Sequence, residues 1–169
     1  MTIDYVIDKY SKDIIYCDID STINNHHLRI KKWTKDGVIN KKAYSYEEIM
    51  KDEVLPNSVI SNHKLYEKFN IYFITSRKKF PNAYNATKDW LENNNFRYDK
   101  IILTDNLGEK IQYIKNDKYT KIFIDDFTKK HHLDKPILDI ENINKFKKEN
   151  IPFIIFKNNW NEITKNLIN

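Results

Sequence analysis

Short apolar runs that alternate with helix-like segments are the feature that most constrains the fold of this chain. Five runs of three or four apolar residues occur, at residues 14–17, 71–74, 101–103, 122–124 and 153–156. A strand that is buried on both faces reads as such a run, and strands that alternate with helices form a mainly parallel sheet. We therefore predict a three-layer α/β domain, with right-handed crossovers that place helices on both faces of a five-stranded sheet.

Residues 24–56 interrupt this alternation, between the first strand and the first core helix. The Asp36-Gly37 pair lies between two strand-like stretches and indicates a hairpin. Ser45, with Glu48 three residues later, indicates a capping box that opens a short helix over residues 46–51. Long connections at the carboxyl edge of a sheet usually carry function. We therefore interpret residues 24–56 as a small flap, or cap, inserted after the first strand.

The composition bounds the class of protein. A chain of 169 residues is long enough for one domain with a sizeable core and short for two, so we predict a single domain over residues 1–169. Its apolar runs are far shorter than the roughly 18 residues of a membrane span. Residues 1–12 lack the apolar stretch of a signal peptide, and the single cysteine, Cys17, forms no internal disulfide. We expect a cytoplasmic protein that does not associate with a membrane.

The formal net charge of +5 leaves two interpretations open. One is a polyanionic partner such as nucleic acid. The other is a set of scattered lysines that keep the protein soluble. With Gly37 and Gly108 as its only glycines, the chain contains neither a Gly-rich P-loop nor a dinucleotide-binding fingerprint. The sequence leaves the oligomeric state open.

Polar side chains directly follow three of the apolar runs. Asp18-Ile19-Asp20-Ser21-Thr22 follows the first run, Thr75-Ser76-Arg77 the second, and Asp125-Asp126 the fourth. Ligands of open α/β sheets bind outside the carboxyl ends of the strands, so we expect these side chains to meet at one edge. Several carboxylates converge there only with a compensating cation, and oxygen ligands without nearby His or Cys favour Mg²⁺.

This set of residue types is suited to phosphoryl transfer. Hydroxyl groups of Thr75 or Ser76 can donate to a phosphate, and a lysine early on the helix before the fourth strand, Lys110, can neutralise it. A carboxylate can then attack phosphorus and form an aspartyl-phosphate. A second carboxylate, two residues further on, can protonate the leaving oxygen and later activate water. Lys110 is placed by spacing alone, and Lys115 and Lys121 are rivals.

The order of these motifs resembles that of the haloacid dehalogenase-like hydrolase superfamily over residues 14–156. The matching residues are the D-x-D-x-T pattern of Asp18, Asp20 and Thr22, followed by Thr75, Lys110 and the pair Asp125-Asp126. The resemblance implies a Rossmann-like fold whose five-stranded sheet has the order 3-2-1-4-5. Ser21 stands where the family usually has glycine.

The resemblance also implies a role for each matching residue. Asp18 would be the nucleophile, and Asp20, which phosphatases keep and dehalogenases lack, would be the general acid and base. Thr75 would bind phosphate, Lys110 would stabilise the phosphate and the nucleophile, and Thr22 would steady the nucleophile loop. The implied Mg²⁺ ligands are the carboxylates of Asp18, Asp125 and Asp126 and the carbonyl of Asp20.

Two branches of the superfamily are similar enough to indicate a substrate class. Arg29 and Arg77 are similar to paired arginines in the phosphatase domain of phage-type polynucleotide kinase–phosphatases, and arginine can hold a phosphate bidentately. We therefore include Arg29 and Arg77, with Thr22 and Ser76, among the substrate-binding residues. Residues 87–91, 98–99 and 156–161 are similar to stretches of 5′(3′)-deoxyribonucleotidases.

These resemblances lead to one function and two alternatives. We predict a Mg²⁺-dependent phosphatase that removes phosphate from nucleic-acid 3′ ends or from nucleotides, in functional pairing with a kinase or a ligase. The first alternative is a 5′(3′)-deoxyribonucleotidase acting on free nucleoside monophosphates. The alternative of another class is a catalytically silent nucleic-acid-binding module.

Histidine and aromatic residues outside the motifs leave further alternatives open. His26 and His27 could reach the substrate from the flap, whereas zinc binding by the histidine pairs lacks a third ligand at suitable spacing. Trp33, Tyr44 and Tyr46 could stack on a base or could form a small core within the flap.

Overall fold

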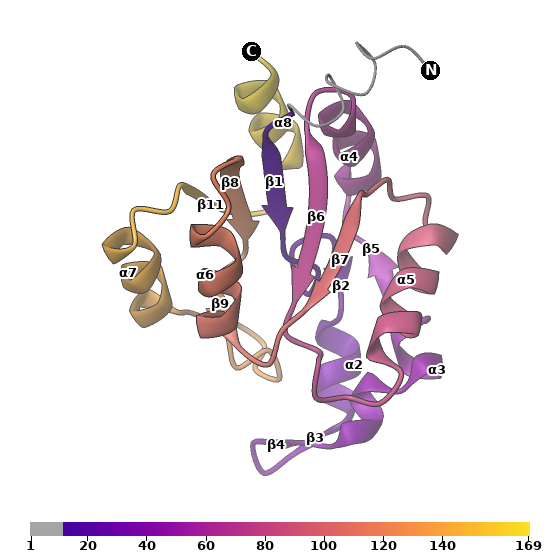
Figure 1. Ribbon diagram of the computed structural model, residues 1–169. Helices are drawn as coiled ribbons and strands as arrows, with labels where there is room; N and C mark the ends of the chain where they lie inside the picture. Colours follow the sequence, from indigo (N-terminus) through magenta and orange to yellow (C-terminus); the bar gives the residue numbers. More distant parts are fainter. Residues whose placement is uncertain (1–11) are drawn as a thin grey trace.

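The computed structural model describes residues 12–169 and shows a five-stranded parallel sheet between two layers of helices (Figure 1). The strands are β1 (Ile14–Cys17), β6 (Asn70–Thr75), β7 (Lys100–Leu103), β8 (Thr120–Asp125) and β11 (Phe153–Ile155). Their spatial order is β7-β6-β1-β8-β11, and every neighbouring pair is parallel. The predicted order 3-2-1-4-5 is therefore confirmed. Most of the amino-terminal stretch considered above as a leader lies outside the described residues.

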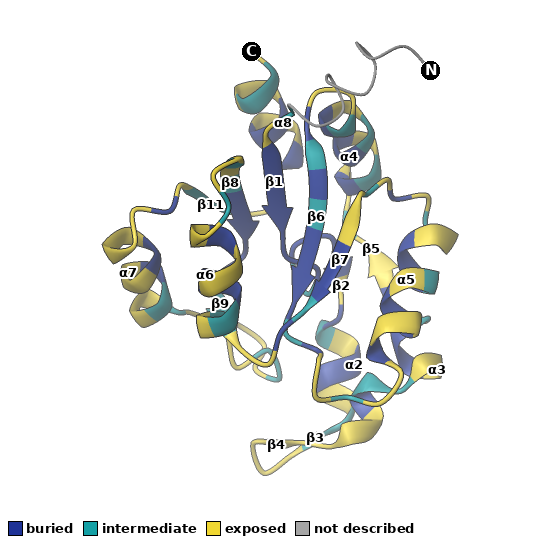
Figure 2. Ribbon diagram, in the orientation of Figure 1, coloured by how far each residue is buried: buried dark blue, intermediate teal, exposed yellow. Residues whose placement is uncertain are grey.

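Each face of the sheet has its own apolar core. Ile15 and Cys17 of β1 belong to one buried cluster, and Ile14 and Tyr16 belong to the other, as expected from the twofold alternation of side chains along a strand. The first face is covered by α4 (Ser58–Tyr66), α5 (Ala83–Asn93) and α8 (Trp160–Ile168), and the second by α6 (Leu107–Lys115) and α7 (Ile140–Lys148). Figure 2 shows the central strands buried between helices whose outer faces are exposed. No helix within residues 12–169 combines the length and apolar character needed to cross a membrane.

Asparagine takes the place of glycine at many turns of this glycine-poor chain. Asn57 and Asn82, at the starts of α4 and α5, have φ angles of 65° and 58°. Asn95, just after α5, has a φ of 61°. Asparagine tolerates this left-handed region better than most residues, because its short amide forms local hydrogen bonds. Two glycines in the whole chain are therefore enough for a fold with many turns.

The flap, residues 24–56, folds as a compact series of short elements. These are β2 (Asn24–Asn25), α2 (His27–Lys32), β3 (Thr34–Lys35), β4 (Val38–Ile39), the 3₁₀ turn η1 (Lys41–Tyr44), α3 (Tyr46–Ile49) and β5 (Glu53–Val54). The predicted hairpin is confirmed: β3 and β4 pair in an antiparallel manner around Asp36 and Gly37, whose φ angles are 50° and 76°. The hydroxyl of Ser45 accepts from the N–H of Glu48 as predicted, although α3 ends at Ile49, two residues early.

Aromatic side chains hold the flap against the domain. Trp90 of α5 donates from Nε1 to the carbonyl of Asp52 at 2.9 Å. Tyr44 stacks on Phe80, in the loop after β6, with ring centroids 3.8 Å apart. Trp33 donates to Glu48 within the flap at 2.9 Å. Trp33 therefore makes its hydrogen bond within the flap, whereas Tyr44 joins the flap to the loop after β6.

A second short hairpin follows β8 and was not predicted. It is formed by β9 (Thr128–Lys129) and β10 (Ile137–Leu138), which pair in an antiparallel manner. The loop of this hairpin contacts the flap in two places. Lys31 forms an ion pair with Asp134 at 2.5 Å, and the rings of His26 and His131 lie 4.7 Å apart. The flap and the β9–β10 hairpin thus meet at the carboxyl edge of the sheet.

Replacing Glu48 with glutamine is expected to destabilise the flap by about 1 kcal/mol at neutral pH. The Glu48 carboxylate accepts from Lys51, Trp33 and Lys32, and these hydrogen bonds lower its pKa to about 2. The half-exposed lysines keep the effect modest.

Because this pKa is lower in the folded protein than in the unfolded chain, the stabilisation is present above about pH 4.5 and is lost as the pH falls toward 2. Urea unfolding of both proteins at pH 7 and pH 3 checks this. A difference in unfolding free energy that stays the same or grows at pH 3 would contradict the prediction.

Candidate active site

Asp18 and Lys110 form a buried ion pair at the carboxyl edge of the sheet. Asp18 directly follows β1, and its backbone N–H donates to β8 at 2.9 Å. Lys110 lies near the start of α6, and its Nζ donates to Asp18 Oδ1 at 2.6 Å and to Asp125 Oδ2 at 3.4 Å. Both side chains of the ion pair are less than a tenth exposed. The fold therefore brings Lys110, rather than its rivals Lys115 and Lys121, to the first aspartate.

Three buried carboxylates gather beside this lysine. One oxygen from each of Asp18, Asp125 and Asp126 lies within 4.8 Å of the others. The N–H of Phe127 donates to Asp125 at 2.7 Å, and the hydroxyl of Thr128 donates to Asp126, so both carboxylates have fixed orientations. Asp20, which was predicted as a ligand through its backbone carbonyl, does not add its carboxylate to this trio.

Electrostatics at the trio favour a bound cation. Burial, reinforced by the charges of Asp125 and Asp18, raises the pKa of Asp126 to about 9. Burial also raises the pKa of Asp18 to about 7, because the effect of Lys110 is outweighed by burial together with Asp125 and Asp20. Carboxylates that repel one another in this way bind hard divalent cations through oxygen. The residues present therefore fit a cation of the Mg²⁺ type.

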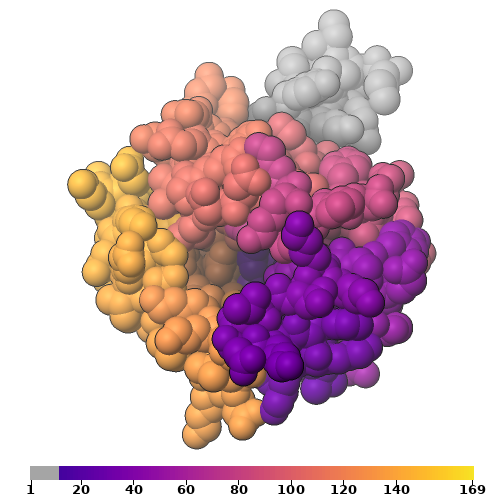
Figure 3. All heavy atoms as spheres, turned by 90° about the horizontal axis from the view of Figure 1, so that it is seen from below, coloured from indigo at the N-terminus to yellow at the C-terminus, as the bar shows by residue number. Residues whose placement is uncertain are grey.

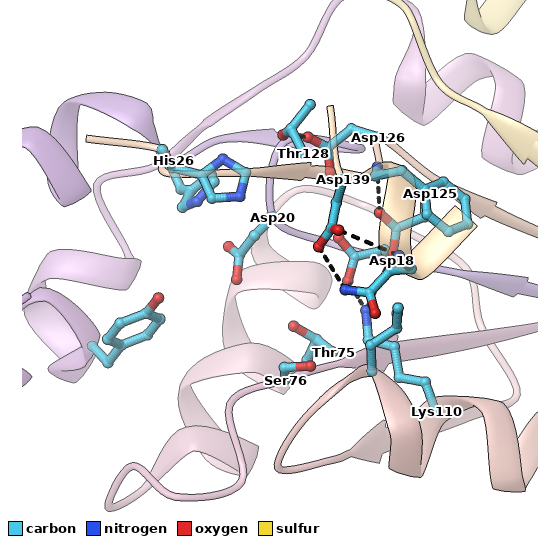
Figure 4. Close-up of a pocket in the computed structure, with 15 residues that line it drawn as sticks. Asp18, Asp20, His26, Thr75, Ser76, Lys110, Asp125, Asp126, Thr128 and Asp139 are labelled. Atoms are coloured by element: carbon cyan, nitrogen blue, oxygen red, sulfur yellow. Dashed lines mark hydrogen bonds and ion pairs between the residues drawn. The ribbon is translucent and has the colours of Figure 1, made fainter. Parts of the chain in front are cut away.

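Asp20 is held by two buried arginines. Arg77 donates to both of its carboxylate oxygens, from Nε at 3.0 Å and from Nη2 at 2.5 Å, and Arg29 donates from Nη2 at 3.3 Å. Burial alone would raise the pKa of Asp20, but Arg77, His26 and Arg29 together hold it well below its usual range. The carboxylate is therefore ionised and fixed in orientation. Figure 4 shows it on the side of the cavity away from Lys110.

Thr75 presents a buried hydroxyl group to the same site. It ends β6, is 1 % exposed, and belongs to the cavity wall. Its Oγ1 is the one buried side-chain oxygen or nitrogen of residues 12–169 that has no hydrogen-bond partner. A buried hydroxyl without a partner is costly, so an acceptor placed in the cavity would stabilise it.

One open cavity brings these groups together (Figure 4). Its wall combines the carboxylates, Lys110 and the hydroxyls with residues of the flap, α6, α7 and the β9–β10 hairpin. The residues that line it are Asp18, Asp20, His26, Tyr44, Thr75, Ser76, Leu107, Lys110, Asp125, Asp126, Phe127, Thr128, His131, Asp139 and Asn142. Figure 3 shows a hollow on this face, bordered by the flap and by the segment after β8.

Three predicted substrate-binding residues do not reach the cavity wall. Thr22 is fully buried, where its hydroxyl accepts from the N–H of Asp126 at 3.1 Å, so it supports the loops. Arg77 is 1 % exposed and is engaged by Asp20 and by Thr87 at 3.1 Å. Arg29 is 5 % exposed and donates to Asp20, Asp52 and a backbone carbonyl. The prediction that the arginines contact the phosphate directly is therefore replaced by a role in holding Asp20.

Six residues of the cavity wall that carry polar groups were not among the predicted site residues: His26, Tyr44, Thr128, His131, Asp139 and Asn142. His131 and Asp139 follow the last motif, and Asn142 accompanies Asp139, the N-cap of α7. His26 is 2 % exposed and lies 3.0 Å from the Ser21 hydroxyl, and burial lowers its pKa to about 3, so its ring is neutral. The position of His26 in the flap, close to the first motif, could have identified it as a site residue from the sequence. Residues 131–142 carry no such sequence signal, because the β9–β10 hairpin has no motif of its own.

Comparisons with known proteins address the fold. No protein-family model matches the chain, and a search of curated proteins found no match. A haloacid dehalogenase-like family protein from Streptococcus pneumoniae superimposes with a TM-score of 0.55 and 12% identity, over 85% of this chain and 84% of that one. A hydrolase from Streptococcus pneumoniae TIGR4 superimposes with a TM-score of 0.55 and 10% identity, over 94% of this chain and 100% of that one.

A chain of the Pnkp1/Rnl/Hen1 RNA repair complex also matches, with a TM-score of 0.55 and 11% identity over 86% of this chain. The match spans 43% of that longer chain. At such low identities the likeness concerns the fold, and it agrees with the order of the five-stranded parallel sheet. The chain has the fold of the haloacid dehalogenase-like hydrolases.

Proposed function

We propose that this chain is a metal-dependent phosphomonoester hydrolase that works through an aspartyl-phosphate on Asp18. The observation that carries this proposal is the pairing of two features in one cavity. A buried lysine contacts Asp18 at 2.6 Å, and the unpartnered hydroxyl of Thr75 faces the same space. A phosphate group supplies the negative charge and the acceptor oxygens that these two donors need.

The chemistry divides into two steps. The free carboxylate of Asp20 is ionised, so it first takes up a proton as the negatively charged phosphate binds beside it, because a nearby negative charge raises the pKa of a carboxyl group. In the first step, an oxygen of Asp18 attacks phosphorus, the bond from phosphorus to the leaving oxygen breaks, and Asp20 returns this proton to that oxygen. In the second, Asp20 takes a proton from the water that attacks the aspartyl-phosphate and frees inorganic phosphate. The ionised, fixed state of Asp20 fits this second role directly. Lys110, Thr75 and Ser76 hold the phosphate oxygens.

Mg²⁺ is the cation that we assign to Asp18, Asp125 and Asp126, with the carbonyl of Asp20 as a further ligand. When bound, it would offset the charge of the carboxylates and of the phosphate. The structure supports this through the hard oxygen donors of the trio, none of which is sulfur or nitrogen.

The proposed substrate is a phosphate on a nucleic-acid 3′ end, with free nucleotides as the alternative. An open cavity supports the former, and so does the shared fold with part of an RNA repair complex, which also supports functional pairing with a kinase or a ligase. The test is phosphate release from a 3′-phosphorylated oligonucleotide and from deoxynucleoside 3′- and 5′-monophosphates, with Mg²⁺ or with EDTA. We expect Mg²⁺-dependent release that favours the oligonucleotide.

Each other result of this test has a defined meaning. Turnover of mononucleotides alone would select the nucleotidase. Binding of the oligonucleotide without release would select the silent module. Absence of release from all substrates, or release that EDTA does not reduce, would overturn the proposal.

Addition of Mg²⁺ is expected to stabilise the protein against heat. At a free Mg²⁺ concentration 100 times the dissociation constant, the unfolding free energy rises by about 2.7 kcal/mol, which corresponds to a Tm increase of roughly 5–10 °C. Calorimetry with MgCl₂, compared with NaCl at equal ionic strength, checks this. Asp126→Asn should lose most of the increase; an equal increase in that variant, or none in the parent protein, would contradict the assignment.

A further inference from the structure

Basic residues are frequent in the outer part of the flap. The outer flap, residues 27–44, contains six basic residues and one acidic residue, an excess of five. The formal net charge of the whole chain is also +5, so the remaining residues sum to zero. Arg29, Lys31 and Lys32 of this stretch form ion pairs with acidic residues outside it. Lys35, Lys41 and Lys42 form none within residues 12–169, and they carry the part of this charge that stays uncompensated.

Part of this positive charge lies at the mouth of the cavity. Tyr44, the last residue of η1, lines the cavity, and Lys41 and Lys42 belong to the same short turn. Tyr44 stacks on Phe80, and Lys79 lies over the Phe80 ring, 5.2 Å from its centroid. The Tyr44–Phe80 contact thus joins the flap to the loop after β6, and the three lysines are close in sequence to these two rings. The ammonium group of Lys42 lies 5.6 Å from the centroid of the Trp33 ring. We call Lys41, Lys42 and Lys79 the basic rim.

The lysines of the basic rim are exposed, and none of them forms an ion pair within residues 12–169. Their neighbours differ in this respect. Lys78 pairs with Glu109 at 3.0 Å, and Lys31 pairs with Asp134. The basic rim therefore carries positive charge that no carboxylate of residues 12–169 compensates, as Lys130 and Lys135 of the β9–β10 hairpin also do.

The cavity itself has the opposite charge. Five aspartates line it, against Lys110 as its single lysine or arginine. A phosphate can be held there with a cation, but the wall does not attract the rest of a polyanion. Attraction of a chain of phosphates must therefore come from outside the cavity, within roughly one Debye length of 8 Å at physiological salt.

We propose that the basic rim binds the phosphodiester backbone of a polynucleotide whose terminal phosphate lies in the cavity. This inference rests on the proposed function and extends it, because it selects a polynucleotide over a mononucleotide as the substrate. The strand leaves the cavity past Tyr44 and meets Lys41 and Lys42 on one side and Lys79 on the other. Each lysine contacts a backbone phosphate without reading the sequence.

The test compares two triple variants that remove the same charge. The first replaces the basic rim with glutamine: Lys41→Gln, Lys42→Gln and Lys79→Gln. The matched control replaces Lys118, Lys121 and Lys165, which are exposed lysines without an ion pair within the described chain; the first two lie at the amino end of β8 and the third on α8. The substrates are a 3′-phosphorylated, single-stranded 12-mer and a deoxynucleoside 3′-monophosphate.

For the rim variant, the ratio of kcat/KM on the 12-mer to kcat/KM on the mononucleotide should fall about tenfold or more. The decrease should arise from a higher KM for the 12-mer. Binding of a labelled 12-mer, followed by fluorescence anisotropy over 50–200 mM salt, should weaken. The slope of log K against log salt should shrink by about two, at roughly 0.7 per lost contact with a single strand. The control variant should behave like the parent protein in both assays.

The two proposals can fail separately. Loss of 12-mer binding in the rim variant supports the rim even if no substrate is hydrolysed, a result that would overturn the proposed function alone. An unchanged ratio together with unchanged binding would overturn the rim proposal. An equal loss in the control variant would also overturn it, because the attraction would then come from overall charge.

Discussion

Asp18→Asn is expected to reduce phosphate release at least about 10³-fold, because the carboxamide group cannot act as the nucleophile. Asparagine has nearly the same shape as aspartate, and it removes a buried charge that Asp125 and Asp20 oppose. Lys110 keeps Asp125 as a partner at 3.4 Å. The fold should therefore be retained, with a change in unfolding free energy of about 1 kcal/mol or less.

Trapping the intermediate makes this test specific for the mechanism. Substrate labelled in the phosphate is mixed with the protein and quenched in acid, and the protein is then examined for bound label. The parent protein should carry label and Asp18→Asn none. Asp13→Asn is the matched control, since it makes the same substitution at an exposed position at the other end of the same strand. Phosphate release by Asp18→Asn above a tenth of the rate of the parent protein, or label bound to the variant, would contradict the role of Asp18 as the nucleophile.

Arg77→Met is expected to have the second largest effect, a decrease in kcat of roughly 100-fold with little change in KM. The guanidinium group touches both oxygens of Asp20 and does not line the cavity. Its loss frees the carboxylate to rotate, with Arg29 as its remaining cationic partner at 3.3 Å. Because a buried ion pair is broken, stability should also fall, by about 3 kcal/mol.

The split between kcat and KM separates two roles for this arginine. A direct phosphate contact, as the sequence led us to expect, would raise KM, whereas positioning of Asp20 lowers kcat. Arg77→Lys, which keeps the charge but not the paired donors, should recover stability more than kcat. Arg97→Met is the control, because Arg97 is the remaining arginine of the chain and is exposed. A rise in KM with kcat unchanged would contradict the positioning role.

Local sequence patterns were sufficient to predict much of the fold. Apolar runs identified the five strands, and their alternation with helices predicted the parallel sheet, because strands buried on both faces need continuous apolar sequence. The Asp36-Gly37 hairpin was predictable for a similar reason, since few residue pairs accept two left-handed conformations in succession. The β9–β10 hairpin escaped prediction because two-residue strands leave too short a pattern.

Some features of the candidate site could likewise be predicted from local sequence, and others depend on tertiary packing. The sequence by itself determined that Asp18, Thr75 and Asp125 lie at one edge. Each of them ends or directly follows a strand of a parallel sheet, and the backbone sets where such residues project. Only the tertiary structure decided the partners of the long side chains. Arg77 meets Asp20 across 57 positions of the chain, and a flexible side chain binds whichever carboxylate the packing brings near. Long-range packing of this kind leaves no local pattern to read.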